Sequence, residues 1–198
     1  MIKVVLKRPV LLFILVMSIT EAMATLVYNQ SELVAAIKIA KPGDSILLSS
    51  TSNWQNIVIN FEAIGTKEKP IVLAGFPNIV TLSGNSSLAI GGDYLEVSNL
   101  YFTNGFAKER AVIEFRTKDK LANHCRITNC AVINYTPTDV MVNNNWINLQ
   151  GTYNELDHCY FTGKTNQGPY LVVRYKKEAG YVDGSDTAPS SYHHIHHN

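Results

Sequence analysis

Four histidines form the densest group of possible metal ligands in the sequence. They are His193, His194, His196 and His197, with Ile195 between the two pairs. Imidazole nitrogens are common metal ligands, but adjacent side chains of a β-strand point to opposite faces. On a strand these four side chains cannot converge on one ion, so we predict a structural or surface role for them. We assign no metal ligand in the chain.

Glu155 and Asp157 are a pair of carboxylates of the kind that glycoside hydrolases use. They lie two residues apart, so on a strand both side chains would share one face. The pattern predicts two solvated charges on an outward face rather than a catalytic pair.

The three cysteines are too few for a disulfide scaffold, and their spacing matches no metal site. Cys130 and Cys159 occupy matching positions in two similar segments of the chain, which would place them next to each other in the interior. We interpret them as buried free thiols. A disulfide between them stays open, because it needs suitable Cβ geometry and an oxidising compartment.

A loop rich in glycine and amides, residues 163–168, is followed by several basic side chains. Lys164, Asn166 and Arg174 could bind an anionic sugar chain, because charge-assisted hydrogen bonds hold carboxylates well. The alternative is a tight turn whose glycines serve the backbone and whose lysine is solvated. We name these three residues as candidate substrate-binding residues, and we name no catalytic residue.

The composition favours a well-packed β protein that is rich in loops. The chain has 198 residues, of which 17% are charged, whereas ordinary domains carry about 25% charged residues. The 18 asparagines outnumber the 16 acidic residues. So few charges argue against a disordered tail, a coiled coil or a nucleic-acid binder, and we expect no nucleic-acid partner.

Residues 1–24 have the features of a secretory signal peptide. They combine a positive start, an apolar run at residues 10–19 and a small-residue cleavage site at Ala22-Met23-Ala24. A membrane anchor is the alternative, but the run is far shorter than the roughly 20 residues that a spanning helix needs. We expect residues 25–198 to be secreted or periplasmic, with no membrane association after cleavage.

Four segments of the chain superimpose on one another. They share an apolar column whose members lie 30, 29 and 39 residues apart: Val97, Ile127, Leu156 and Ile195. Two further columns are Leu100, Cys130, Cys159 and Asn198, and Phe102, Val132 and Phe161. Each unit is typical of two short strands that meet at a polar bend, with a third strand before them. These third strands are expected at residues 88–90, 112–115, 146–149 and 170–173.

Stacked units of three short strands predict a parallel β-helix. A sandwich or a barrel would join its strands by hairpins and would show no stacked columns. A short helix over residues 30–41, with Ser31 as N-cap and Leu33, Val34, Ile37 and Ile39 in its apolar stripe, is expected to cover the open end. The predicted fold is all-β, a right-handed parallel β-helix with this capping helix, truncated at its C-terminal end.

The stacked bends also explain the excess of asparagine. Asn99 and Asn129 occupy the same bend position in consecutive units, and His158 and His197 continue the column. Asparagine tolerates a left-handed backbone and can form hydrogen bonds along such a stack.

The sequence resembles the N-terminal part of polysaccharide lyase family six, the alginate lyases and chondroitinase B. The matching segments are residues 40–46, 65–71, 99–102, 151–173 and 194–198. Many β-helix proteins share the first of these, whereas the stretch from Gly151 to Val173 is much more specific.

This resemblance implies cleavage of a uronate polysaccharide by β-elimination, with alginate favoured over chondroitin or dermatan sulfate. In such lyases a lysine is the base, an arginine assists, and Ca²⁺ neutralises the carboxylate beside the C5 proton. Those residues belong to coils that follow the His197-Asn198 segment, so no residue of this chain takes their roles. We expect this piece to be inactive, and the full-length enzyme to be a monomer that binds an anionic polysaccharide.

Two other functions fit a β-helix. One is a non-catalytic carbohydrate-binding or adhesin-like surface protein. The other is a glycoside hydrolase, which would need two or three carboxylates clustered across coils. A Glu-x-Glu pair followed by a lysine downstream of Asn198 would favour the lyase. The bond preference and the choice between endo and exo action stay open.

Overall fold

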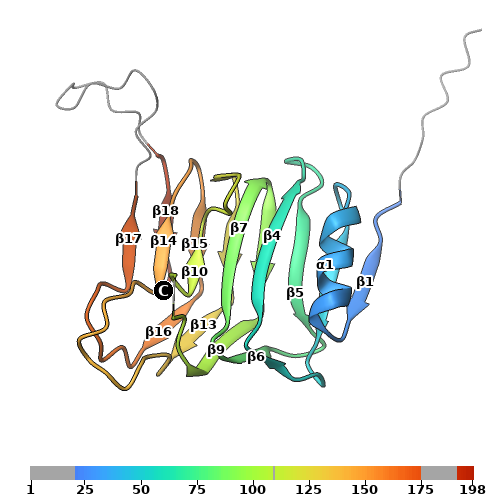
Figure 1. Cartoon of the computed structure of the whole chain (residues 1–198). Helices are drawn as coiled ribbons and strands as arrows, with labels where there is room; N and C mark the ends of the chain where they lie inside the picture. The colour runs from blue at the N-terminus through green and yellow to red at the C-terminus, as the bar shows by residue number, and fades with distance from the viewer. Residues whose placement is uncertain (1–20, 109, 175–190) are drawn as a thin grey trace, which may run out of the picture.

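The computed structural model describes residues 21–108, 110–174 and 191–198, which wind into a row of stacked coils (Figure 1). Most of the expected signal segment, residues 1–20, lies outside the described residues. Successive coils pair strand on strand in parallel, which builds three sheets along one axis. The expected parallel β-helix is therefore confirmed, and it places the same side of every coil on the same face of the molecule.

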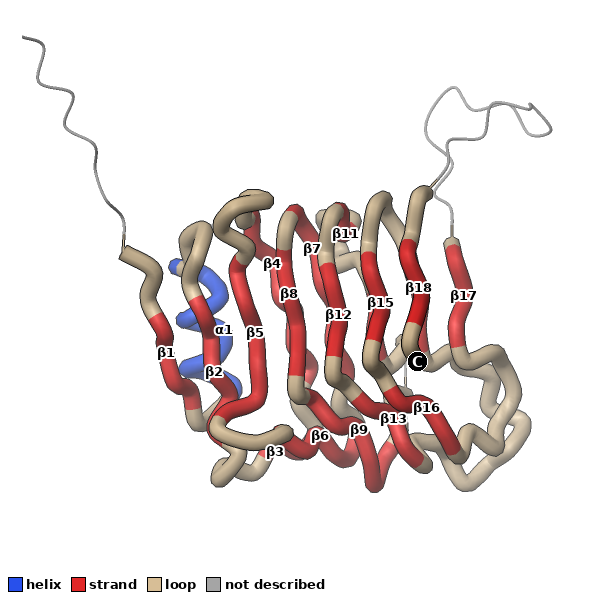
Figure 2. The backbone as a smooth tube through the Cα atoms, turned by 180° about the vertical axis from the view of Figure 1, so that it is seen from behind, coloured by secondary structure: helices blue, strands red, loops and turns tan. Residues whose placement is uncertain are grey.

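Sheet A holds the strands β1 (Ala24–Val27), β2 (Ser45–Ser49), β5 (Ile71–Phe76), β8 (Leu95–Ser98), β12 (Arg126–Thr128), β15 (Glu155–Asp157) and β18 (His194–His196), as Figure 2 shows from behind. Sheet B holds β3 (Trp54–Gln55), β6 (Val80–Gly84), β9 (Leu100–Gly105), β13 (Ala131–Ile133) and β16 (Tyr160–Thr162). Sheet C holds β4 (Val58–Ile64), β7 (Ser87–Asp93), β10 (Ile113–Glu114), β11 (Ala122–Asn123), β14 (Ile147–Leu149) and β17 (Leu171–Val173). The chain visits A, B and C in turn.

The strand register matches the columns expected from the sequence. Ile127 pairs with Val97 below it and with Leu156 above it, and Leu156 pairs with Ile195. The column of Phe102, Val132 and Phe161 is also in register. Val97, Ile127 and Leu156 are almost completely buried, so the core is a stack of apolar side chains inside the coils.

One left-handed residue makes each bend between sheets A and B. The φ angles are 58° at Asn99, 50° at Asn129, 50° at His158 and 53° at His197. Left-handed backbone disfavours most residues with a Cβ, and asparagine tolerates it best. This confirms the expected bend column. The two histidines continue it by stacking their rings, with centroids 5.3 Å apart.

The bend between sheets C and A carries a second ladder of left-handed residues, made of Tyr94, His124, Tyr153 and Tyr192. Their rings stack nearly parallel, with centroid distances of 4.7, 5.0 and 5.0 Å. These distances match the spacing of about 4.8 Å between neighbouring strands. The sequence reasoning missed this ladder, because its members differ in residue type and lie outside the aligned segments.

The helix α1 (Gln30–Ile39) begins at the predicted residue and ends two residues before the predicted end, but its N-cap is Asn29 and not Ser31. Asn29 has extended backbone, and its side-chain oxygen accepts a hydrogen bond from the Glu32 amide at 3.0 Å. The Glu32 carboxylate in turn accepts from the Tyr28 amide at 2.8 Å. This reciprocal arrangement satisfies two amides at the helix start, whereas the Ser31 hydroxyl only donates to Asn29.

The buried stripe of α1 is narrower than expected and consists of Leu33, Ala36 and Ile37. Val34 and Ile39 are exposed, which contradicts the expected stripe. The helix covers β1, β2 and β4 at the first coil. None of the described helical residues forms a segment long and apolar enough to cross a membrane.

Candidate functional site

The outer face of sheet C is a polar surface that crosses the strands. Leu88, Ile113 and Ile147 are in register and point into the core. Because side chains alternate along a strand, the following residue of each strand faces outward. This outward row consists of Asn60, Ala89, Glu114, Asn148 and Val172.

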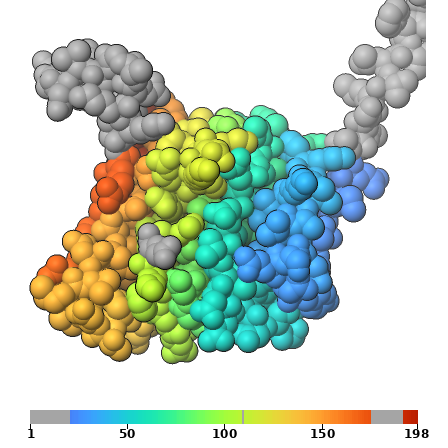
Figure 3. All heavy atoms as spheres, in the orientation of Figure 1, coloured from blue at the N-terminus to red at the C-terminus, as the bar shows by residue number. Residues whose placement is uncertain are grey.

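A hollow of about 570 Å³ lies on this face, which Figure 3 shows from the front. It is lined by Asn60, Glu62, Ala89, Arg110, Glu114, Arg116, Thr117, Lys118 and Asp119. The small side chain of Ala89 lies between Asn60 and Glu114 in the outward row and leaves room between these longer neighbours. The lining therefore combines basic, acidic and amide groups around a shallow floor.

Three of the charged side chains that line the hollow, Glu62, Glu114 and Arg116, are held by neighbouring side chains. Glu62 forms an ion pair with Lys120 at 3.3 Å and accepts a hydrogen bond from the Thr117 hydroxyl at 2.6 Å. Gln150 links the other two, because it donates to Glu114 at 3.3 Å and accepts from Arg116 at 3.5 Å. Glu62 and Glu114 thus have described partners, and the Arg116 guanidinium lies between protein acceptors and solvent.

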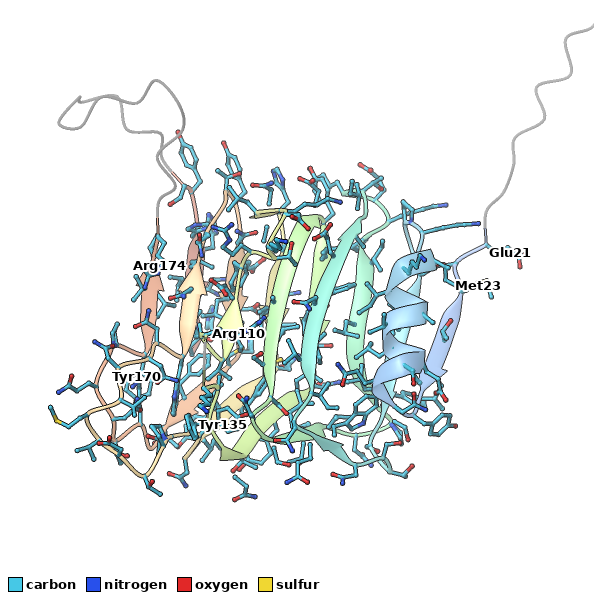
Figure 4. All side chains as sticks on the ribbon, in the orientation of Figure 1. Glu21, Met23, Arg110, Tyr135, Tyr170 and Arg174 are labelled. Atoms are coloured by element: carbon cyan, nitrogen blue, oxygen red, sulfur yellow. The ribbon has the colours of Figure 1, made fainter. Side chains whose placement is uncertain are left out.

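A second recess of about 240 Å³ continues the hollow toward β17. It is lined by Lys108, Arg110, Ala111, Asn143, Asn144, Asn145, Asn148 and Arg174. Arg110 lines both recesses, and Figure 4 shows Arg110 and Arg174 on the same side of the molecule. We call the two recesses together the sheet C groove. Its β17 end is basic, since no described residue that lines the second recess is acidic.

Lys164 and Asn166, two of the three predicted substrate-binding residues, do not line this groove and instead support a loop beside it. The Lys164 ammonium donates to the Asn166 backbone oxygen at 3.0 Å, to the Asn166 side-chain oxygen at 2.9 Å and to the Gln167 oxygen at 2.9 Å. Burial lowers the pKa of Lys164. The Asn166 amide donates to Val142 and Asn144. A direct role in binding stays a prediction for both residues.

Arg174, the third predicted residue, lies in the sheet C groove, where its Nε donates to Asn148 at 3.3 Å. The sequence reasoning missed Arg110, Arg116 and Asn148. Alternation could have found the last two, because Arg116 and Asn148 each flank a buried residue of a predicted strand. It could not have shown that the residues between β9 and β10 bring Arg110 over the same face.

Asp157 contradicts the expectation of two solvated charges. Its side chain is fully buried, and Arg126 binds it through two hydrogen bonds, at 2.9 and 2.7 Å. Thr128 and the Nδ1 atom of His158 complete its surroundings, at 3.2 and 2.5 Å. The Arg126 guanidinium holds the pKa of Asp157 well below its usual range. Asp157 is buried because Arg126 and Thr128 of the preceding coil cover its carboxylate.

Glu155 is only half-buried and lies on the same face as Asp157. It contacts Arg126 at 3.7 Å and the Nε2 atom of His196 at 3.0 Å. The side chain of His193 instead accepts a hydrogen bond from the Asn154 amide at 3.2 Å. The histidine run is therefore divided between separate surroundings. In the part of the chain that the structure describes, no group of three or more His, Cys, Asp or Glu side chains is placed to hold a metal ion.

All three cysteines are buried free thiols, which confirms the expectation for Cys130 and Cys159. Cys130 and Cys159 precede the paired residues Ala131 and Tyr160 and so stack in neighbouring coils. A hydrogen bond to Cys159, together with burial, raises the pKa of Cys130. Burial raises the pKa of Cys125 to about 12, so the thiol form of that residue packs as a small apolar side chain.

Comparison with known proteins now identifies the family. The profile described as chondroitinase B matches residues 27–198, nearly the whole described fold. The chain belongs to the family six polysaccharide lyases. A search of curated proteins finds no match.

Solved structures of family six lyases are similar to this chain in both fold and sequence. A mutant of the alginate lyase AlyGC is 34% identical, with a TM-score of 0.78 over 88% of this chain and 23% of that chain. A family six lyase from Pseudopedobacter saltans is 33% identical, with a TM-score of 0.68, and the match covers 74% of this chain and 33% of that one. A mannuronic acid specific lyase from human gut microbiota is 29% identical, with a TM-score of 0.67 over 75% of this chain and 36% of that chain. This family six chain thus spans about a quarter to a third of these relatives.

Proposed function

We propose that this chain forms the N-terminal coils of a secreted or periplasmic lyase that cleaves a uronate polysaccharide by calcium-assisted β-elimination. Alginate is the proposed substrate, ahead of chondroitin and dermatan sulfate. The observation that carries the proposal is the 34% identity to an alginate lyase over 88% of the chain. A match of that extent in both sequence and coil geometry supports a common substrate class, an anionic polysaccharide.

The part that these coils play is to bind the polymer along the sheet C groove. Arg110 and Arg116 lie on either side of β10, and Arg174 follows β17 two coils further on. A guanidinium can bind a carboxylate through two parallel hydrogen bonds. The groove runs across the strands, so successive coils place their side chains along it at intervals of about 4.8 Å. A polymer with one carboxylate per sugar ring therefore meets basic and amide groups repeatedly along this axis.

The proposed reaction removes the C5 proton beside the carboxylate, which leaves negative charge on that group. A calcium ion supplies charge neutralisation in such chemistry. Calcium is bound by oxygen ligands, carboxylates above all. Among the described residues no three or more His, Cys, Asp or Glu side chains are grouped to hold an ion, and Glu62 and Glu114 already have partners. We therefore assign to these residues the binding and orientation of the polymer and no proton-transfer step.

The groove proposal predicts that its arginines determine affinity for the polymer. Changing Arg116→Ala or Arg174→Ala should each weaken binding of an alginate oligosaccharide by about tenfold, because a charge-assisted hydrogen bond contributes roughly 1.5–3 kcal/mol. Isothermal titration calorimetry at two salt concentrations measures this. Affinity should fall with salt in the native chain and less so in the variants.

Lys67→Ala is the matched control, because Lys67 is exposed and lies outside the groove. It should leave the affinity unchanged. An equal loss of affinity in the control and the groove variants would mean that net charge, and not the groove, attracts the polymer.

A second prediction concerns catalysis by the 198-residue chain itself. Incubated with alginate or dermatan sulfate in the presence of Ca²⁺, it should form no unsaturated uronate, because its described residues include no group of three or more His, Cys, Asp or Glu side chains placed to hold the ion. Ultraviolet absorbance of the unsaturated product follows the reaction, with an active family six lyase as the positive control. Robust product formation would refute this proposal, whereas binding without cleavage is the expected result.

A further inference from the structure

The outer face of sheet B carries two tyrosines with an alanine between them. Ala131 pairs with Tyr101 of the coil below and with Tyr160 of the coil above, so the three side chains lie in one outward row. Tyr160 is 60% exposed. Two strand spacings place Tyr101 and Tyr160 about 9.6 Å apart, with only the methyl group of Ala131 on the floor between them.

This row opens into a cavity of about 490 Å³, which we call the tyrosine slot. Its lining is mostly apolar and consists of Ile79, Leu100, Tyr101, Asn129, Cys130, Ala131, Ile133, His158 and Tyr160. Its polar end is formed by Asn129 and His158, two of the four residues in the bend column between sheets A and B. The slot therefore has apolar walls and floor and a polar end.

The width of the slot suits a single saturated ring. Two aromatic faces that each contact a ring at about 4 Å need roughly 8 Å between them, and two strand spacings separate the backbones that carry the tyrosines by about 9.6 Å. A pyranose ring has C–H bonds on its faces and hydroxyl groups on its edge. Its faces thus match the tyrosines, whose rings are apolar and whose hydroxyl groups remain available for hydrogen bonds.

At the polar end of the tyrosine slot, the ring of His158 is held in one orientation. The Nδ1 atom of His158 is bound to the Asp157 carboxylate at 2.5 Å, and a carboxylate can only accept a hydrogen bond. The proton of that bond therefore lies on Nδ1. The Nε2 atom of His158 has no hydrogen bond to a described residue, and in the neutral ring it is the acceptor, so a sugar hydroxyl can donate to it.

We propose that the tyrosine slot binds one pyranose ring of a carbohydrate chain, as a second carbohydrate site on a different face from the sheet C groove. His158 is the only ionisable group of the lining, apart from the tyrosine hydroxyls and the buried Cys130 thiol. Recognition therefore depends on the ring and not on its carboxylate. The proposal does not rest on lyase activity, and it applies to neutral and uronate sugars alike.

Nuclear magnetic resonance titration of the whole chain tests this, with cellobiose as a neutral probe and a mannuronate disaccharide as a charged one. Both should shift the amide signals of Tyr101, Ala131 and Tyr160 saturably, with a Kd of about 1–10 mM. The two Kd values should agree within about threefold, and salt should not change them, because no ion pair is formed. Absence of a saturable shift at these residues would overturn the proposal.

Two variants and a control locate the binding. Tyr160→Ala should raise the Kd at least fivefold by removing one wall, and Ala131→Leu should abolish binding by filling the floor. Tyr28→Ala is the control, because Tyr28 is 51% exposed and lies outside the slot. Unchanged binding in both slot variants would contradict the proposal, as would sedimentation data showing that a second copy of the chain occupies this face. Loss of the groove arginines should leave slot binding intact, so the two proposals can fail separately.

Discussion

Changing Asp157→Asn should lower the free energy of unfolding by about 3 kcal/mol, the lower end of the range for breaking a buried ion pair. The Asp157 side chain is fully buried and accepts two hydrogen bonds from Arg126. The amide keeps the shape but not the charge, so the guanidinium loses its partner. Because 38% of the Arg126 side chain is exposed, water compensates part of this loss, which is why we expect the lower end.

The same pair predicts how stability depends on pH. The pKa of Asp157 is lowered in the folded protein, chiefly by the hydrogen bond from Arg126. Its contribution is therefore complete above the pKa of an unfolded aspartate, about 3.9, and is lost as the pH falls below that value. Urea unfolding at pH 7, 5 and 3 should show that the gap between the native protein and Asp157→Asn narrows only at pH 3.

Glu155→Gln is the matched control for Asp157, because it lies on the same strand and also contacts Arg126. Its side chain is 37% exposed, and exposed ion pairs contribute at most about 1 kcal/mol. If both variants lose the same stability, the buried carboxylate has no special role.

Changing Asn154→Ala should cost a similar amount, about 3 kcal/mol or more, through unsatisfied backbone groups. The Asn154 side chain is completely buried. Its oxygen accepts from the Cys125 amide at 2.9 Å, and its nitrogen donates to the Ala122 and Gln150 oxygens, both at 2.8 Å. Alanine leaves the Cys125 amide and the Gln150 oxygen without a described partner, whereas the Ala122 oxygen keeps the hydrogen bond from the Thr152 amide at 3.3 Å. Each unsatisfied group costs roughly 1–3 kcal/mol where water does not reach it.

Thermal and urea unfolding measure the loss in Asn154→Ala, and Asn53→Ala is the control at an exposed position with no described side-chain hydrogen bond. The control should change stability by less than about 0.5 kcal/mol. A loss below 1 kcal/mol in Asn154→Ala would mean that water replaces the carboxamide. That result would contradict its role as a bridge between coils.

Much of the fold was predictable because each coil of a solenoid needs the same type of residue at the same position. Val97, Ile127 and Leu156 had to be apolar for the same reason, and the bend required left-handed backbone at Asn99 and Asn129. Each repetition adds independent support to one register. The strand β1 was not expected, because it lies outside the repeated segments and its residues overlap the predicted cleavage site.

The groove was less predictable, because it depends on how coils of unequal loop length align. Lys164 and Asn166 had the right chemistry, but their hydrogen bonds are made within a loop. Arg110 reaches the groove only because the chain between β9 and β10 passes over sheet C. The burial of Asp157 likewise depends on a side chain 31 residues earlier, and no pattern within a single strand indicates this.

The ladder of Tyr94, His124, Tyr153 and Tyr192 repeats at a regular distance along one edge of the molecule. Its rungs are 4.7–5.0 Å apart, so each coil adds one rung and one row of side chains to every face. A duplicate of the 29-residue unit 125–153, inserted after Tyr153, would lengthen the molecule by about 4.8 Å. The length of a polymer-binding surface on this scaffold can therefore be changed in steps of one coil, and each added coil would add one ring to the stack.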